Sequence, residues 1–277
     1  MSKHIFILLL VSLFNGLIFG CSKMESSVEK NIDNQPETAW TSIFNGKDLS
    51  GWVPKFKGYP AGVNYNNTFR VVDGLLTVSY EDWDNFDNQS FGHLFTTKSY
   101  SDYRIRVEYR FIGDQIVNTP EFEWAYRNNG IMLHSPPAEY MGIDQAFPMS
   151  AEAQLLGGNG KEARTTANLC SPSTHIVKNG ALIKKHCTKS SSSTYHGDQW
   201  VWFEAEMSAQ GPVKHYINGE LVFEYDGLQV DPEDEWSKQW LAEGNPLILT
   251  SGHISLQAET HPIQFRRIEI QPLANNE

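Results

Sequence analysis

The sequence predicts an all-β fold, an antiparallel β-sandwich of the jelly-roll type, and two observations carry this prediction. Three two-residue turn signals each separate a pair of strand-like runs: Asp73-Gly74, Asn179-Gly180 and Asn218-Gly219. These dipeptides tolerate the positive φ angles that a type I′ hairpin turn requires. Apolar and polar residues also alternate without a break in 103–111 and 200–207, as they do in strands that bury one face. Helical periodicity is scarce, which favours two packed sheets.

The individual elements follow from the same signals. The alternation of the C-terminal run changes phase between Phe265 and Ile268, which predicts a bulge around Arg266-Arg267. Only Asp234–Glu243 is compatible with a short helix, and a loop insertion fits this stretch equally well. The runs beside the three turns are expected as strands over 69–72 and 75–80, 175–178 and 181–183, and 214–217 and 220–225.

The first twenty residues are typical of an export signal (1–20). A short basic start precedes an apolar run, 5–19, that is too short to span a bilayer as a stable helix. The run ends in Leu-Ile-Phe-Gly-Cys21, which resembles the bacterial lipoprotein cleavage box and implies lipid attachment at Cys21. Ordinary secretion without lipid is the alternative. We therefore expect an exported bacterial lipoprotein, anchored to a membrane in the periplasm or at the outer membrane or cell surface.

The remaining chain divides into a tether and one domain. Residues 21–39 are polar and lack periodicity, so we expect a flexible tether. Residues 40–277 contain no second linker, composition break or repeat, and their length suits a single β-sandwich domain. The formal net charge of −11, without a basic stripe, excludes nucleic acid as an expected partner.

Cysteine usage agrees with export. If Cys21 carries the lipid, Cys170 and Cys187 remain as an even pair in an oxidising compartment, and we predict a disulfide between them. The functional alternative is that one of these two cysteines is a catalytic thiol, but no neighbouring residue favours a depressed thiol pKa.

The stretch 253–261 contains the most informative polar pattern. Gln257, Glu259 and His261 recur at every second position, so in an extended strand their side chains leave on one face while apolar residues take the other. An amide, a carboxylate and an imidazole on one face point to a site for a polar, uncharged ligand. A half-exposed strand of an antiparallel sheet is the plainer interpretation.

The same construction occurs twice more. Glu152 and Gln154 share one phase of the stretch 151–155, and Met132 and His134 share one phase of 130–134. If these three strands are neighbours in one sheet, their polar side chains form one concave surface. Taken alone, each strand could equally be a half-exposed strand whose polar side chains face solvent.

A resemblance to a known family is carried by the stretches Ser42–Trp52, Asn128–His134, Glu152–Gln154 and Ile254–Gln257 through Phe265–Ile268. Together they resemble a bacterial family, the 3-keto-disaccharide hydrolase or 3-keto-glucoside lyase/hydratase domains. The resemblance spans about residues 40 to 273 and implies a concanavalin A-like sandwich that acts on carbohydrate. Two departures weaken it locally: Asn129 replaces the commoner serine, and Pro262 follows His261 where the family commonly has glycine.

The resemblance implies cleavage of glycosides already oxidised to a ketone at C3. The ketone acidifies the hydrogen at C2, so a base can remove it, the C1 substituent leaves by elimination, and water then adds. No nicotinamide cofactor is required for these steps, and the sequence has no Gly-rich dinucleotide loop. The expected partners are thus an oxidised sugar and, through the lipid, a membrane.

Candidate roles follow from the motifs. We expect Glu152 and His134 as base and acid in an undecided order, with His261 as a third catalytic candidate. Arg127 and Arg164 could polarise the ketone. The remaining candidate substrate-binding residues, which offer amides or a carboxylate to the sugar, are Asn129, Gln154, Gln257 and Glu259.

Other interpretations remain open from sequence. A two-carboxylate glycoside hydrolase, with Glu152 and Glu259 flanking the bond, is one, and a non-catalytic carbohydrate-binding module is another. A divalent metal could bind Glu, His and Gln on one sheet, although the spacing carries no metal signature. His93 fits a packed loop or the site equally well, and Trp124 fits the core or a sugar-stacking position.

Overall fold

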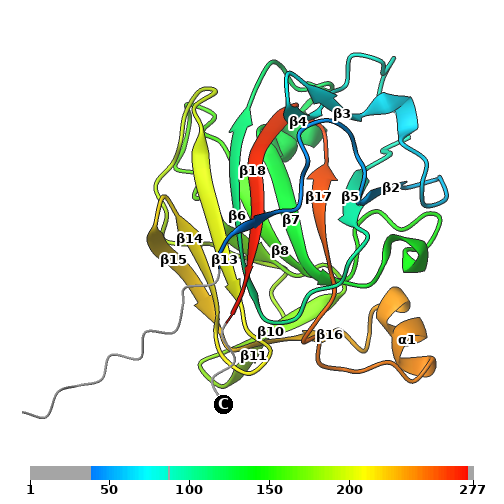
Figure 1. Cartoon of the computed structure of the whole chain (residues 1–277), viewed down its shortest axis with the longest axis vertical. Helices are drawn as coiled ribbons and strands as arrows, with labels where there is room; N and C mark the ends of the chain where they lie inside the picture. The colour runs from blue at the N-terminus through cyan, green and yellow to red at the C-terminus, as the bar shows by residue number, and fades with distance from the viewer. Residues whose placement is uncertain (1–38, 87, 274–277) are drawn as a thin grey trace, which may run out of the picture. The chain divides into compact units, whose positions relative to one another are not determined.

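The computed structural model describes residues 39–86 and 88–273, which form two stacked sheets of antiparallel strands joined by turns and loops (Figure 1). The predicted signal peptide, Cys21 and all of the predicted tether except residue 39 lie outside the described residues. In the described part of the chain, none of the helices has the length and apolar character that crossing a membrane requires.

The first sheet has eight strands. Their order is β15-β14-β13-β6-β18-β4-β3, and β1 also pairs with β18. The strands are β15 (Glu220–Tyr225), β14 (Val213–Ile217), β13 (Val201–Met207), β6 (Tyr103–Phe111), β18 (Ile263–Pro272), β4 (Leu75–Val78), β3 (Phe69–Val72) and β1 (Thr41–Ser42).

The second sheet has seven strands in the order β12-β9-β8-β7-β17-β5-β2. They are β12 (Cys187–Thr188), β9 (Asn168–Cys170), β8 (Ala151–Leu156), β7 (Asn128–Ser135), β17 (His253–Ala258), β5 (Gly92–Thr96) and β2 (Trp52–Phe56). A small third sheet pairs β11 (Ala181–Ile183), β10 (Thr174–Lys178) and β16 (Gly227–Val230). All pairings between these strands are antiparallel.

The core lies between the two large sheets because one face of each is apolar. Ile105 and Val107 of β6 face inward with Ile131 of β7 and Leu256 of β17, and all four are fully buried. This inward phase matches the alternation in the sequence, so the predicted two-sheet antiparallel sandwich is confirmed.

The predicted local features are also present. The turns at 73–74, 179–180 and 218–219 join β3 to β4, β10 to β11 and β14 to β15, and all six of their residues have positive φ. The register of β18 against β6 shifts between Arg266 and Glu269, where Arg267 has a φ of 51°, so the predicted bulge is confirmed.

The stretch Asp234–Glu243, for which the sequence allowed a short helix or a loop insertion, is helical. Helix α1 (Glu235–Ala242) begins after Asp234, whose side chain accepts hydrogen bonds from the backbone N–H groups of Trp236 and Ser237. This is the usual way in which an aspartate caps a helix N-terminus. The other helices of the described residues are short 3₁₀ helices: η1 (Tyr65–Asn67), η2 (Pro120–Ala125) and η3 (Ala138–Tyr140).

The predicted disulfide is present. Cys170 and Cys187 lie directly opposite each other on β9 and β12 and form a bond with an S–S distance of 2.07 Å. The bridge closes a loop with a sequence separation of 17 residues. A loop of this size constrains the unfolded chain, and such a bridge contributes about 3 kcal/mol to stability.

We therefore expect the Cys170→Ala/Cys187→Ala double variant to lose about 3 kcal/mol of unfolding free energy. Urea unfolding of the oxidised wild type and of the variant measures this difference. Reduced wild type is the control and should resemble the variant. Equal stability of all three samples would contradict the prediction.

Candidate active site

The three strands with the polar pattern are neighbours, in the order β8-β7-β17. Leu155 and Ala153 of β8 and Ile131 of β7 belong to the core, so Glu152 and Gln154 lie on the opposite face, away from the other sheet. The side chain of Gln257, next to the core residue Leu256, is on that face as well. Of the expected polar surface, the shared face of Glu152, Gln154 and Gln257 is therefore confirmed.

A row of polar side chains crosses this outer face of the seven-stranded sheet. On neighbouring strands, Lys55 lies opposite His93, His93 lies opposite Gln257, and Gln154 lies opposite Asn168. The pairing of Leu256 with Ile131 sets Gln257 beside Gly130, which itself pairs with Gln154. The polar row is thus Lys55, His93, Gln257, Gln154 and Asn168.

Gly130 leaves a gap in the middle of the row, and Glu152 fills it. A Cβ atom at position 130 would lie 2.5 Å from Oε1 of Glu152, so only glycine admits this carboxyl group. Glu259 follows β17 directly and interacts electrostatically with Glu152. We refer to Glu152 and Glu259 as the carboxyl pair.

Both members of the carboxyl pair resist ionisation. Burial raises the pKa of Glu152 to about 8. Burial and the negative charge of Glu152 raise the pKa of Glu259 well above its ordinary value. Removal from water and a like charge both disfavour a carboxylate, so the pair is largely protonated at neutral pH and titrates as a unit. Loss of one proton from the pair therefore leaves an acid and a base in one site.

The cation of the row is Lys55. Its Nζ donates to the carbonyl oxygens of Phe56 at 2.8 Å and Ile143 at 3.3 Å. Burial lowers the pKa of Lys55, and the charge of Asp144 opposes this shift. Burial and the charge of Lys55 together lower the pKa of His93 to about 3, so its imidazole is neutral at physiological pH.

Two aromatic and apolar clusters cover the row. Phe91, Phe122 and their neighbours form one cluster, and Phe95, Ala138 and Met141 form the other. The ring of His93 lies 6.0 Å from that of Phe147, which packs on the first cluster. This roof, built largely from loop residues, explains why polar groups on an outer sheet face are buried, and it excludes water from them.

Several buried polar atoms beneath the roof have no hydrogen-bond partner among the described residues. They include both ring nitrogens of His93, both amide atoms of Gln257 and Oε2 of Glu259. Each such atom costs roughly 1–3 kcal/mol when it stays unpaired. A cluster of them is typical of a site that completes its hydrogen bonds with a ligand.

The predicted position of His134 is wrong. A β-bulge shifts the register of β7 against β17, and His134 has a φ of 57°, so its side chain leaves the phase of Met132. Its nitrogens bond to the carbonyl oxygens of Leu249 and Ser101, and its ring contacts the core residue Tyr103. Burial lowers the pKa of His134 against the effect of these bonds.

Asn129 also lies away from the row. It shares the phase of Ile131 and pairs with the core residue Leu155, and its Nδ2 donates to the carbonyl oxygen of Gln257 at 2.6 Å. The neighbouring Asn128, which the sequence did not single out, has the phase of Gly130 and leaves its buried Oδ1 without a partner among the described residues.

His261 lies in the turn after β17. Its ring contacts those of Phe111 and Tyr126, at centroid distances of 5.6 Å and 5.1 Å. Burial and the positive charge of Arg127 lower its pKa to about 3, so this imidazole is neutral as well. Arg127 itself donates to the carbonyl oxygen of Gly197. Substrate roles for both residues remain predictions.

Arg164 holds backbone together near the site. Its guanidinium donates to the carbonyl oxygens of Tyr126, Gly157 and Trp124, and these contacts join the segment after η2 to the end of β8. Burial lowers the pKa of Arg164, and the charge of Glu162 opposes the shift. Ketone binding by Arg164 remains a prediction.

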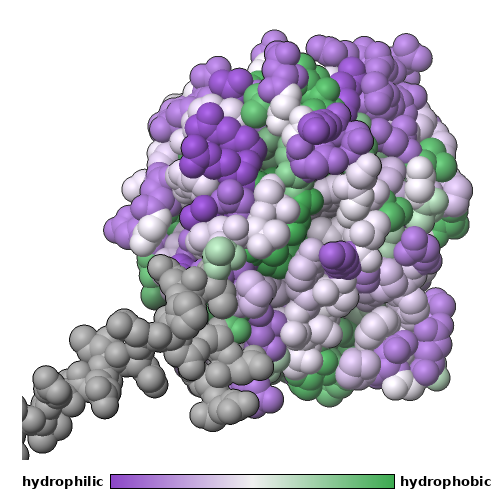
Figure 2. Space-filling view, in the orientation of Figure 1, coloured by the Kyte–Doolittle hydropathy of each residue, from purple (hydrophilic) through white to green (hydrophobic). Residues whose placement is uncertain are grey.

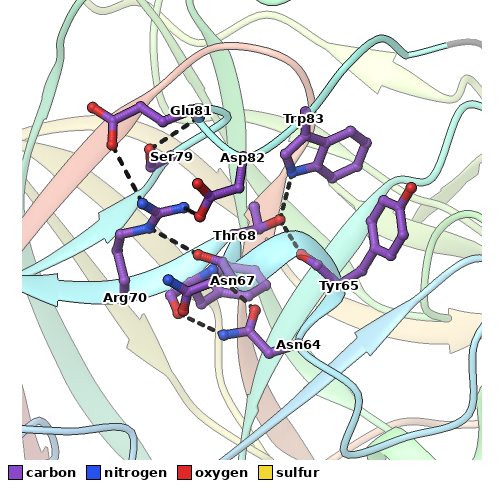
Figure 3. Close-up of polar contacts among 10 residues, drawn as sticks. Asn64, Tyr65, Asn67, Thr68, Arg70, Ser79, Glu81, Asp82 and Trp83 are labelled. Atoms are coloured by element: carbon purple, nitrogen blue, oxygen red, sulfur yellow. Dashed lines mark hydrogen bonds and ion pairs between the residues drawn. The ribbon is translucent and has the colours of Figure 1, made fainter.

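Another cavity, of about 450 Å³, lies at the β3–β4 edge of the other sheet and includes Arg70. Figure 3 shows that Glu81, Asp82 and the carbonyl oxygen of Asn67 surround the Arg70 guanidinium. Figure 2 shows hydrophilic residues gathered over this end of the molecule. With its main cation already paired, this cavity is a weaker candidate than the polar row.

Sequence reasoning missed Lys55 and Asn168 and left His93 undecided. Lys55 sits in the apolar run Trp-Val-Pro-Lys-Phe, and a charged residue within such a run was the available signal. Nothing local marks Asn168. Within the residues that the structure describes, no group of three or more His, Cys, Asp or Glu side chains is arranged to hold a metal ion.

The chain is similar to solved structures of two bacterial proteins. A crystal structure of a Parabacteroides distasonis protein with a provisional glycosyl hydrolase name is 19% identical, with a TM-score of 0.48, covering 85% of this chain and 94% of that one. A carbohydrate-binding module of Bacillus subtilis is 11% identical, with a TM-score of 0.38, covering 68% and 90%. Neither likeness bears on activity, and no curated protein matches the sequence.

The family comparison covers almost all of the described residues. The sequence profile of the 3-keto-alpha-glucoside-1,2-lyase-like domain matches residues 39–271. This span contains the polar row, the carboxyl pair and both large sheets except the last residue of β18. The chain therefore belongs to the family of 3-keto-alpha-glucoside-1,2-lyase-like domains, a carbohydrate-active family.

Proposed function

We propose that this protein cleaves 3-keto-glycosides by elimination across C1 and C2, followed by addition of water. The observation that carries the proposal is the carboxyl pair, two desolvated and interacting carboxyl groups inside a row of polar side chains. Membership of the family supports the same substrate class.

The carboxyl pair matches both proton transfers of the elimination. The reactive state is the one in which the pair has lost one of its two protons. The ionised member then removes the C2 proton, and the C–H electrons form an enolate with the C3 carbonyl. As the enolate returns to the ketone, these electrons form the C1=C2 double bond and the C1–O bond breaks. The other member donates its proton to the departing C1 oxygen. A carboxylate whose pKa is raised to about 8 is a stronger base than an ordinary one. Water then adds its oxygen to C1, and a proton returns to C2.

The rest of the row supports the charge that develops on the C3 oxygen. Lys55 is a cation, and the amide of Gln257 has a free donor. Donors fixed in a site without water stabilise an enolate oxygen without having to reorient. The roof over the row provides such an environment, and its loop side chains must move aside for a sugar ring to reach His93.

The test compares release of a chromophore from a 3-keto-glucoside and from the parent glucoside. We expect release from the ketone alone, because only the ketone acidifies the C2 proton. Release from the parent alone would instead support the two-carboxylate glycoside hydrolase, which the proximity of Glu152 to Glu259 also favours. Binding of both sugars without release from either would indicate a non-catalytic module.

A further inference from the structure

A cleft of about 710 Å³ opens at the β8–β9 end of the polar row, within the size range of roughly 300–1,000 Å³ that is usual for small-molecule sites. Asn168 belongs to both: it lines the cleft, and its Nδ2 donates to Oε1 of Gln154 at 3.0 Å. The cleft is thus continuous with the row through one hydrogen-bonded pair. Residues that line it include Trp124, Leu156, Lys161, Glu162, Asn168 and Lys189.

The most exposed member of the row lies near this end. Lys55, His93 and Gln257 are buried beneath the roof, whereas Gln154, beside the cleft, is only half-buried. Neighbouring strands lie about 4.8 Å apart, so the three spacings from Gln257 to Asn168 span roughly 14 Å. That length accommodates two linked sugar rings, the first over the row and the second in the cleft.

Trp124 provides a platform in the cleft. It leaves 50% of its surface exposed, which is unusual for so large an apolar side chain. Its backbone is held by the bond from Arg164 to its carbonyl oxygen, and its ring lies 6.3 Å from that of the roof residue Phe122. The indole is therefore anchored at its base and open to a ligand, and an indole face packs well against the C–H groups of a pyranose ring.

The charges of the cleft favour a neutral ligand. Lys161 forms an ion pair with Glu123 across the rim, and backbone carbonyls hold the guanidinium of Arg164. The other two charged residues of the lining, Glu162 and Lys189, have opposite signs. No charge of one sign dominates, so a polyhydroxylated neutral ring fits better than a phosphate or a carboxylate.

We infer that this cleft is the subsite for the leaving group, and that it binds a second, neutral pyranose stacked on Trp124. Calling this ring the leaving group rests on the proposed function. The binding of a second ring does not depend on turnover. It makes Trp124 a determinant of specificity for the part of the substrate beyond the scissile bond.

Calorimetric titration of the folded protein with an unoxidised glucosyl disaccharide and with methyl glucoside tests the inference. We expect the disaccharide to bind at least roughly tenfold more tightly, and Trp124→Ala to abolish this preference, since truncating a central tryptophan commonly costs that much affinity or more. Trp124→Phe should retain part of it. Leu221→Ala, which truncates a residue 48% exposed on the other sheet, is the matched control and should change nothing.

The outcomes separate the two proposals. Equal affinity of wild type for both sugars, or a disaccharide preference that survives in Trp124→Ala, would overturn the subsite. Wild type could prefer the disaccharide, lose this preference in Trp124→Ala, and yet release nothing from any 3-keto-glycoside. That result would uphold the subsite and refute the proposed reaction. Melting temperatures of the variants, which should equal that of wild type, confirm that they fold.

Discussion

Replacing Glu152 with glutamine is expected to reduce cleavage of a 3-keto-glucoside by roughly a hundred- to ten-thousandfold, the range that a positioned acid or base contributes. Glutamine has nearly the same shape and fits the space above Gly130, but it can neither accept the C2 proton nor donate one to the leaving oxygen. Because Glu152 is largely protonated in the folded protein at neutral pH, the neutral amide should not disturb the fold. Initial rates of chromophore release measure the loss.

Two further variants make this test specific. Glu259→Gln should cause a comparable loss, because the two carboxyl groups act on one substrate and titrate together. Glu220→Gln makes the same chemical change at an exposed position on β15 and should retain the wild-type rate. A folded Glu152→Gln protein with undiminished turnover would remove Glu152 from the mechanism.

The second large effect concerns stability and pH. A carboxyl group whose pKa is higher in the folded than in the unfolded state contributes stability below its unfolded value, and this contribution is lost as the pH rises through the folded pKa. For Glu152 the window runs from the ordinary 4.5 to about 8. Relative to a Glu152→Gln/Glu259→Gln variant, wild type should therefore lose about 1.4 kcal/mol per pH unit for each protonated carboxyl group.

Urea unfolding of both proteins between pH 5 and pH 8 measures this difference, in roughly the interval that the shifted pKa defines. Subtracting the two curves removes the opposite contribution of the buried histidines, such as His93 and His215. Burial lowers their pKa values to about 3 and about 4, so they destabilise the fold in acid. A stability difference that stays constant across this range would show that the carboxyl pair ionises normally.

The sequence predicted those parts of the site that follow from strand phase alone. The two-residue period of a strand placed Glu152, Gln154 and Gln257 on one face. It failed for His134, because a single extra residue in β7 reverses the phase beyond the bulge, and bulge positions depend on the register between strands. It also failed for Asn129, whose phase is that of the core.

The interaction of Glu259 with Glu152 depends on chain topology. The two residues are more than a hundred positions apart in the sequence. They come close in space because a single strand, β7, lies between β8 and β17 in the sheet. Likewise Lys55, His93 and Asn168 join the row only through the pairing of β2 with β5 and of β8 with β9. Local patterns carry no information about such pairings.

The sequence by itself determined the antiparallel sandwich, its hairpin turns, the disulfide partners and the polar face of β8 and β17, because periodicity and turn chemistry are local properties. Only the tertiary structure decided that the carboxyl pair is buried beneath an aromatic roof and resists ionisation, and that a cleft beside Trp124 opens at the β8–β9 end of the polar row. A pKa and a cavity depend on what surrounds a side chain, and these surroundings come from segments distant in the chain.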